Sequence, residues 1–331
     1  MATIKYINSI FCNWEKYECL DIRPIESRNI YPISRVTSHF DYSEKELKKL
    51  RRQGFSSAIG KDIMDRIEDL SILFSKNKPV LLLDESPFYI AQAIWQHYQP
   101  TSNVFIYKGG YGALLKEANK VLKSKYHFII LCGETGVGKT DLLNSLEKKG
   151  EQVLNLEEIA RHNGSVFGNL SNQNQPIQET FILDLALILS EYDQKKPIFV
   201  ESEKFSLGKN IIPLTLSESF ENGIKIRLFL PKENRIKRLV KEYAAVNDFK
   251  LKEGIEKLKF RIGKDASSQI IRDLEQKNYD KVAERLIEYF DSTESYQSIH
   301  TQEYDMTINN LEINKAAEEL IKNLGKKKRL P

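Results

Sequence analysis

The chain has 331 residues, of which 41% are hydrophobic and 29% are charged, and its formal net charge is +4. That length is enough for two ordinary domains, each with its own core, and so small a net charge identifies no partner. The three cysteines show neither a disulfide spacing nor a metal-binding pattern, and no apolar stretch approaches the roughly 18 residues of a membrane span. The first residues also lack the apolar core of a signal peptide. These features predict a cytoplasmic protein without a membrane segment and leave its oligomeric state open.

Residues 1–125 alternate short apolar strands with amphipathic helices, a pattern typical of a parallel α/β sheet. We expect strands at residues 18–22, 79–83 and 104–107. We expect helices at residues 42–53, 61–74, 88–98 and 113–122. The sequence therefore predicts one small α/β domain in this part of the chain.

A complete phosphate-binding motif opens the second part of the chain, residues 126–331. An apolar run at residues 128–132 precedes the sequence GETGVGKT, and leucines at helical spacing follow it. Strand, glycine loop and helix in this order predict a P-loop, in which glycines let backbone N–H groups surround phosphate oxygens. The helix N-terminus adds partial positive charge. Lys139 would neutralise terminal phosphates, and Thr140 can hold a magnesium ion. The predicted phosphate-binding residues are Gly133, Glu134, Thr135, Gly136, Val137, Gly138, Lys139 and Thr140.

The rest of the second part again alternates strands and helices. We expect strands at residues 153–156, 197–200, 224–230 and 304–309. We expect helices at residues 178–192, 232–245 and 313–324, with two or three more within 249–290. This pattern predicts a parallel-sheet P-loop domain with a helical insertion near residues 232–300.

Two carboxylates and a basic pair are candidates for chemistry near the P-loop. Glu201 and Glu203 end a strand, where an acid can hold a magnesium shell or act as a base; the alternative is an ordinary exposed strand end. Arg161 and His162 stand beside Gly164 and Ser165, a combination that suits a diphosphate or a tRNA phosphate. The alternative for this pair is a helix C-terminus, where cations meet the helix dipole favourably.

Two glutamines and a basic helix are further candidates. Gln175 and Gln178 either orient a substrate or cap the helix that follows. Residues 232–264 contain eleven Lys or Arg against five Asp or Glu, and Arg235 and Arg238 lie on one predicted helix there. This is a candidate track for tRNA phosphates, although charge runs also form ordinary solvated faces.

Three further segments carry recognisable patterns: LEEIARHNGSVFG at 156–168, QPIQETF at 175–181, and VESE at 200–203. Together with the P-loop, and in this order, they resemble the bacterial tRNA 2-selenouridine synthase family, which joins an N-terminal rhodanese domain to a P-loop domain. The resemblance runs from about residue 19 to the C-terminus and is strongest over 128–245. It implies action on the wobble 2-thiouridine of tRNA. It also implies catalytic roles for Lys139, Glu201 and Glu203.

Family members are known for two reactions, and the resemblance implies their co-substrates. One is S-geranylation from geranyl diphosphate, and the other replaces sulfur by selenium from selenophosphate, using a cysteine in the rhodanese loop. The partners implied here are therefore tRNA and a phosphorylated small-molecule donor, with magnesium as a candidate cofactor. Because both donors carry phosphate, the P-loop need not be an ATPase site.

The N-terminal part departs from the family pattern at its active loop. Asp21-Ile22-Arg23 and Gly109-Gly110-Tyr111 match, but the loop after residues 79–83 reads DESPFY where the family has Cys-Trp-Arg-Gly-Gly. A rhodanese loop needs a low-pKa thiolate held by positive charge, and two carboxylates would repel selenophosphate. We therefore predict a rhodanese-like domain without its nucleophile, and selenation is doubtful. Cys19 and Cys132 fit packing roles. The family's Ser-Arg after the second glutamate is also replaced, by Lys204-Phe205.

Two other functions fit parts of the sequence. One is a P-loop kinase or NTPase acting on a small molecule, which the strand and helix expected over residues 304–324 also suit. The other is a non-catalytic tRNA-binding relative. The matches over residues 156–181 favour the tRNA-modifying function over both.

Overall fold

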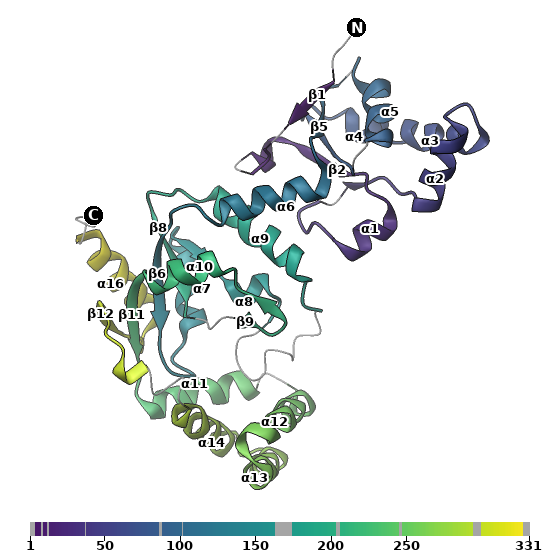
Figure 1. Ribbon diagram of the computed structural model, residues 1–331. Coiled ribbons are helices and arrows are strands. Elements are labelled where there is room, and N and C mark those ends of the chain that lie inside the picture. The colour runs from purple at the N-terminus through teal and green to yellow at the C-terminus, as the bar shows by residue number, and fades with distance from the viewer. Residues whose placement is uncertain are drawn as a thin grey trace. The chain divides into compact units, whose positions relative to one another are not determined.

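The computed structural model describes residues 4–7, 9–11, 13–36, 38–85, 88–100, 102–162, 174–202, 206–244, 247–293 and 299–326. The chain divides into two compact units (Figure 1). Unit 1 comprises Met1–Ser124 together with Ile177–Glu191, and unit 2 comprises Lys125–Pro176 together with Tyr192–Pro331. Each unit is built around a parallel sheet with helices beside it, which confirms the predicted α/β class.

The sheet of unit 1 has five strands in the order β1-β5-β4-β2-β3, all paired in parallel. Its strands are β1 (Lys5–Ile7), β2 (Glu18–Asp21), β3 (Ser38–His39), β4 (Val80–Leu83) and β5 (Val104–Tyr107). The three predicted strands are confirmed. The edge strands β1 and β3 were not predicted, because three and two residues are too few to show a period-two pattern. Central β4 is buried along its whole length, as its continuous apolar sequence predicts.

The helices between the strands of unit 1 are α1 (Ile25–Ile30), α2 (Glu44–Gln53), α3 (Ala58–Glu68), α4 (Ser71–Phe74) and α5 (Tyr89–Tyr98). Helix α6 (Gly110–Val121) follows its last strand, β5. A capping box starts α2, in which the Ser43 hydroxyl accepts from the Glu46 amide and the Glu46 carboxylate accepts from the Ser43 amide. The helix predicted over 61–74 is broken into α3 and α4. The Tyr98 hydroxyl lies 2.7 Å from the Ile67 carbonyl oxygen at the end of α3.

The division into units differs from the expected boundary in one segment, α9 (Gln178–Glu191), which clusters with unit 1 although it follows the P-loop in sequence. Most of its apolar residues are buried, and it packs along α6. The Thr180 hydroxyl donates to the Pro32 carbonyl, and the Ser34 hydroxyl donates to Asp184. These contacts attach the helix to the N-terminal fold.

Unit 2 contains a five-stranded parallel sheet in the order β12-β11-β6-β8-β7. Its strands are β6 (His127–Cys132), β7 (Gln152–Leu154), β8 (Pro197–Glu201), β11 (Ile224–Phe229) and β12 (Met306–Asn309). A separate antiparallel pair joins β9 (Ser206–Leu207) to β10 (Asn210–Ile211). The expected P-loop strand, β6, is thus the central strand.

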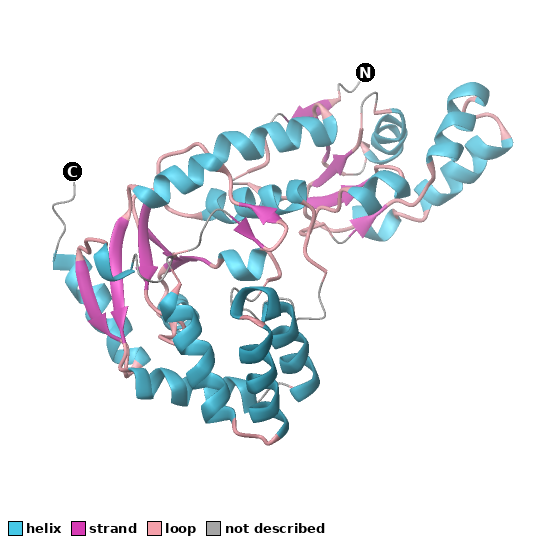
Figure 2. Ribbon diagram, turned by 60° about the horizontal axis from the view of Figure 1, so that its bottom comes forward, coloured by secondary structure: helices cyan, strands magenta, loops and turns pink. Residues whose placement is uncertain are grey.

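Helices beside this sheet are α7 (Lys139–Lys148), α8 (Leu156–Ile159), α10 (Leu214–Glu221) and α16 (Ile313–Lys326). The predicted helical insertion lies between β11 and β12 and consists of α11 (Lys232–Ala244), α12 (Asp248–Ile262), α13 (Lys264–Glu275) and α14 (Tyr279–Ser292). Figure 2 shows these helices as one group. They share an apolar core that includes Leu239, Tyr243, Leu251 and Leu286.

None of the helices in the described residues is both long and apolar enough to cross a membrane.

Candidate phosphate-binding site

The P-loop follows the central strand of unit 2 and leads directly into α7, which begins at Lys139. Gly136 and Gly138 have φ angles of 76° and 85°, a left-handed conformation that glycine adopts without steric cost. The Lys139 ammonium lies 3.1 Å from the Gly133 carbonyl oxygen, so its side chain folds back over the loop. Glycine loop, lysine and helix N-terminus are therefore assembled as the sequence predicts.

The loop lies at the point where the order of the sheet reverses. The chain passes from β6 to the edge strand β7 and returns to β8 beside β6, and it later continues to β11 on the other side of β6. In open α/β sheets, ligands bind at the carboxyl ends of the strands at such a switch point.

Glu201 is the last residue of β8, in register with Leu131 of the P-loop strand. Its side chain is 2% exposed, so the alternative of an ordinary exposed strand end does not apply to it. A buried carboxylate beside a phosphate loop has the placement of a metal-shell ligand or a base. Glu203, Lys204 and Phe205 lie outside the described residues.

Helix α11 packs directly on the P-loop. A Cβ atom at Gly136 would lie 3.0 Å from Leu239 Cγ and 3.2 Å from the Arg235 carbonyl oxygen. At Gly138 it would clash with the Arg238 guanidinium. Each glycine therefore has two roles: it adopts the left-handed conformation of the loop, and its lack of a side chain lets α11 pack against the loop.

Arg235 and Arg238, the two arginines of the predicted tRNA track, make contacts with the P-loop. Arg235 is 6% exposed, pairs with both Asp291 oxygens at 3.0 and 2.6 Å, and donates to the Thr135 carbonyl at 3.2 Å. Arg238 donates to the Val137 and Asn310 carbonyls. In this arrangement the two guanidinium groups support the loop, and their contact with tRNA remains a prediction.

Three residues at this site were missed by the sequence reasoning. The Asn310 amide donates to the Val137 and Gly138 carbonyls at 2.8 and 3.1 Å. Arg227 Nη2 and His300 Nε2 both lie 3.6 Å from a carboxylate oxygen of Glu134. Arg227 lies within β11, between the buried residues Ile226 and Leu228. A charged residue between two buried apolar residues of a strand was the available signal.

Glu134 is unusual for a phosphate-binding loop because it brings a buried negative charge. It is 6% exposed, and its Oε2 atom accepts no hydrogen bond within the described residues. The neighbouring Arg227 guanidinium offsets that charge. Tyr304 belongs to the same cluster, and burial, followed by the charges of Cys132 and Glu134, raises its pKa to about 12.

Arg161 and His162 directly follow the end of α8, and their amides donate to the Glu158 and Glu157 carbonyls. The helix C-terminus considered as an alternative is therefore present. Arg161 is exposed and has a φ of 50°, uncommon for a residue with a side chain. Burial lowers the pKa of His162, so its ring is neutral at pH 7 and offers a hydrogen bond instead of a charge. Gly164 and Ser165 lie outside the described residues.

The two glutamine candidates lie in different units. Gln175 belongs to unit 2, where its amide donates to the Ala160 and Leu207 carbonyls at 3.1 and 2.9 Å and accepts from the Lys209 amide at 3.0 Å. It therefore fixes the β9–β10 turn. Gln178 is the first residue of α9 in unit 1. Substrate binding by either residue remains a prediction.

At the carboxyl end of the unit 1 sheet, Asp84 takes the position that the resemblance assigns to a cysteine. It is 4% exposed, and its oxygens accept from the Glu85 amide at 2.8 Å and the Ala91 amide of α5 at 3.2 Å. Burial raises the pKa of Asp84 to about 7, against the opposing effect of these hydrogen bonds.

The cysteines that the structure describes are buried. Burial raises the pKa of Cys19 to about 12 and also raises that of Cys132, so neither thiol is an activated nucleophile. Cys12 lies outside the described residues.

Magnesium fits the donor chemistry of the P-loop. Thr140 supplies a hydroxyl and Glu201 a carboxylate, the oxygen ligands that this ion prefers. The described residues contain no cluster of three or more His, Cys, Asp or Glu that could hold a metal alone. These residues would therefore hold magnesium together with the phosphates of a ligand.

Comparison with known proteins places the sequence in a family. Residues 126–315 match the family model described as the tRNA 2-selenouridine synthase AAA domain. A tRNA 2-selenouridine synthase from Shewanella woodyi is 36% identical over 141 residues, which cover 41% of this chain and 37% of that protein. The synthase from Shewanella sediminis is 32% identical over 172 residues, 50% of this chain and 44% of that protein.

An uncharacterized protein from Methanocaldococcus jannaschii is 31% identical over 214 residues, 60% of this chain and 91% of that protein. The matched part of the chain thus spans less than half the length of either synthase, 37% and 44%. The family model nevertheless covers more than half of the chain, including the whole P-loop and the sheet around it. The chain therefore belongs to the tRNA 2-selenouridine synthase family, through the AAA domain that residues 126–315 match.

Proposed function

We propose that this chain is a tRNA-modifying enzyme that acts on the wobble 2-thiouridine and transfers a geranyl group to its sulfur. The observation that carries the proposal is the assembled P-loop, with Lys139 folded over it and Glu201 buried at the end of the neighbouring strand. Such a site can hold a diphosphate without any protein nucleophile. Family membership supplies the substrate class, because the relatives are named tRNA 2-selenouridine synthases.

In the proposed step the nucleophile is the thiocarbonyl sulfur of the substrate. A bond forms between this sulfur and C1 of geranyl diphosphate, while the bond from C1 to the diphosphate oxygen breaks. Pyrophosphate leaves with the electron pair, and the N3 proton of the base is released. Lys139 and the loop amides would stabilise the charge that develops on the departing oxygen, an effect that grows as the bond breaks.

Replacement of sulfur by selenium is the less supported half of the family chemistry. Asp84 and Glu85 stand where the resemblance places the reactive cysteine and its neighbour, and the thiols of Cys19 and Cys132 are buried. We propose that selenation by this chain alone is compromised or that it uses a thiol from another protein. Selenouridine formed at a normal rate in a single turnover with selenophosphate would contradict this.

Nucleoside mass spectrometry tests both halves of the proposal. Purified protein is incubated with tRNA that carries 2-thiouridine and with geranyl diphosphate, and then with selenophosphate. We expect a geranylated nucleoside, absent with Lys139→Ala, and no selenouridine. If neither product forms, the proposed enzyme function is wrong.

A small-molecule kinase or NTPase is the second candidate, and one observation favours it. Strand β12 forms an edge of the P-loop sheet, and α16 follows it, as expected for a nucleoside-kinase-like fold. Strand β8, with its buried Glu201, pairs directly with β6. ATP hydrolysis or phosphoryl transfer that Lys139→Ala abolishes, without any geranylation, would favour this candidate. Binding of tRNA without either reaction would indicate a non-catalytic relative.

A further inference from the structure

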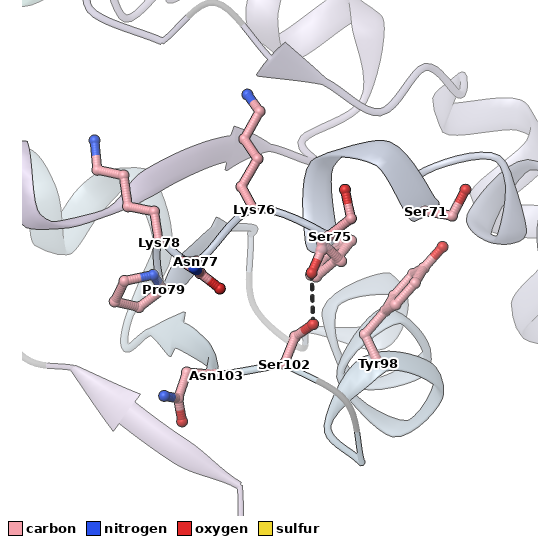
Figure 3. Close-up of a pocket in the computed structure, with 10 residues that line it drawn as sticks. Ser71, Ser75, Lys76, Asn77, Lys78, Pro79, Tyr98, Ser102 and Asn103 are labelled. Atoms are coloured by element: carbon pink, nitrogen blue, oxygen red, sulfur yellow. Dashed lines mark hydrogen bonds between the residues drawn. The ribbon is translucent and has the colours of Figure 1, made fainter.

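Unit 1 contains a cavity at the amino ends of β4 and β5, opposite the strand ends where Asp84 lies (Figure 3). Its volume is about 450 Å³, within the range of small-molecule and nucleotide sites. The end of α4, the loop at residues 75–79 and the residues that lead from α5 into β5 form its walls. No residue proposed to act at the P-loop belongs to this cavity.

The floor of the cavity is internally satisfied. The rings of Phe74 and Tyr98 stack with centroids 3.9 Å apart and planes within 4°. Ser102 Oγ donates to the Phe74 carbonyl at 2.8 Å, and Ser75 Oγ donates to the Ile72 carbonyl at 2.8 Å. Burial, followed by the Glu68 and Asp69 charges, raises the pKa of Tyr98, but neither carboxylate lines the cavity. The floor is therefore rigid and needs no ligand.

The rim, in contrast, presents hydrogen-bond donors. The backbone amides of Lys76, Asn77 and Lys78 donate to no backbone carbonyl within the described residues. The side-chain amides of Asn77 and Asn103 also line the cavity. Successive loop amides of this kind form a concave site for anions.

The charged residues that line the cavity are both lysines. Lys76 and Lys78 extend from the loop to the same side, and the lining includes no carboxylate (Figure 3). Lys76 lies 3.5 Å from Glu18, but its side chain is 53% exposed, so this pair is weak. Two lysines and three successive amides on one loop supply the donors and the positive charge that a phosphate group needs.

We propose that this cavity binds the phosphodiester backbone of RNA, with Lys76 and Lys78 neutralising phosphates and the loop amides donating to their oxygens. The cavity is larger than one phosphate group needs, so it can also accept an adjoining sugar. The choice of RNA rests on the proposed function, which makes tRNA the substrate. A free phosphate compound shares this chemistry and is distinguished in the experiment.

The test compares the full-length variant K76Q/K78Q with the wild type by fluorescence anisotropy, using a labelled tRNA transcript at several salt concentrations. The matched control is K45Q/K49Q, which removes two exposed lysines from α2. We expect K76Q/K78Q to weaken tRNA binding about tenfold and to lower the log–log salt slope by about 1.5, because up to two phosphate contacts are lost. The control should stay within about twofold.

Pyrophosphate and AMP are titrated against the same proteins by calorimetry. If K76Q/K78Q weakens tRNA binding but leaves these compounds unaffected, the RNA backbone is the ligand. If it abolishes binding of AMP, or of pyrophosphate at a site other than the P-loop, while tRNA binds as to the wild type, the ligand is a free phosphate compound and RNA is overturned as the ligand.

The structural alternative is that the lysines only balance the carbonyl ends of α4 and α5. It predicts that K76Q/K78Q has a lower melting temperature and unchanged affinities, a result that would overturn the proposal. An equal loss of tRNA affinity in the control K45Q/K49Q would overturn it as well. The proposed function is judged separately, by geranylation and by Lys139→Ala. If the wild type makes no product but K76Q/K78Q binds tRNA more weakly than the wild type, the proposed binding site stands and the proposed enzyme function is wrong.

Discussion

In unit 2 the central strand β6 runs into a glycine loop and a lysine, whereas in unit 1 the central strand β4 runs into Asp84 and Glu85. Both strands are followed by a helix, α7 in one unit and α5 in the other. At α5 an Asp84 side-chain oxygen itself accepts from the Ala91 amide, so the chain places its own carboxyl group at this helix N-terminus. At α7 the loop offers Lys139 instead. The same strand–loop–helix arrangement thus favours an external anion in one unit and is filled internally in the other.

Buried carboxylates near the two loops are also treated differently. Glu134 in the P-loop has the Arg227 guanidinium and the His300 ring as neighbours, each 3.6 Å away. Asp84 accepts from two backbone amides and forms no ion pair within the described residues, and its burial raises its pKa to about 7. A few side chains therefore set the charge at each loop, and substitutions of these side chains test the difference between Glu134 and Asp84.

Removal of Lys139 should have the largest effect. We expect Lys139→Ala to lower kcat/KM for geranylation by about 10²–10³, since it removes a preorganised cation from the site where negative charge develops. Initial rates from nucleoside mass spectrometry measure this. Lys149→Ala is the matched control, because Lys149 caps the far end of the same helix and pairs with Glu318. A loss below about fivefold in Lys139→Ala would contradict a phosphate role for this loop.

Support of the P-loop by α11 predicts the next largest effect. Arg235→Ala should destabilise unit 2 by about 3 kcal/mol, because it leaves Asp291 and the Thr135 carbonyl without their buried partner. Urea unfolding followed by far-UV circular dichroism measures the change. Lys252→Ala, which breaks the exposed pair with Glu275, is the control and should leave the midpoint unchanged. Full stability together with lost tRNA affinity in Arg235→Ala would instead favour the tRNA contact predicted from sequence.

The P-loop and its flanking strand and helix were predictable because motif, apolar run and helical spacing agree over residues 128–146. The support behind the loop was not. Arg235 and Arg238 stand in a charge run, and sequence cannot distinguish a solvated lysine face from arginines that turn inward to backbone carbonyls. Asn310 and His300 lie more than 150 positions after the loop, and only the pairing of β11 with β6 and β12 brings them near it.

The sequence did not predict the shortest strands, nor the helix that belongs to the other unit. Strands β1 and β3 are too brief for a periodic pattern. Helix α9 follows the P-loop in sequence, but its side chains bond to Pro32 and to Ser34. Long-range packing of this kind leaves no trace in local composition.

Asp84 gives unit 1 a pH dependence that its replacement should remove. Folding raises the pKa of this carboxyl from 3.8 to about 7, so the folded state holds the proton more tightly than the unfolded state. Its contribution to stability is therefore complete below pH 4 and is lost as the pH rises through about 7. Between pH 5 and pH 8 we expect the wild type to lose about 2 kcal/mol from this group, and Asp84→Asn to lose correspondingly less.

Urea unfolding followed by tryptophan fluorescence measures this in unit 1 alone, because both tryptophans of the chain, Trp14 and Trp95, belong to that unit. Asp62→Asn is the control, since that exposed carboxylate only pairs with Arg66 on the surface of α3. Identical pH profiles for wild type and Asp84→Asn would show that Asp84 is already ionised at pH 5, and the contrast with Glu134 would then disappear.

The smallest effect concerns the carboxylate inside the P-loop. Arg227→Met should weaken pyrophosphate binding about tenfold, because Glu134 then keeps its negative charge beside the phosphates without its nearest guanidinium. Calorimetric titration with pyrophosphate measures the affinity, and Arg272→Met, an exposed arginine of α13, is the control. The double variant Glu134→Gln/Arg227→Met separates two explanations. If it restores the affinity, Arg227 acts by offsetting Glu134; if the loss persists, Arg227 acts on the phosphate directly. In the first case the two loops differ in how their own carboxylates are neutralised, by the Arg227 guanidinium beside Glu134 and by protonation at Asp84.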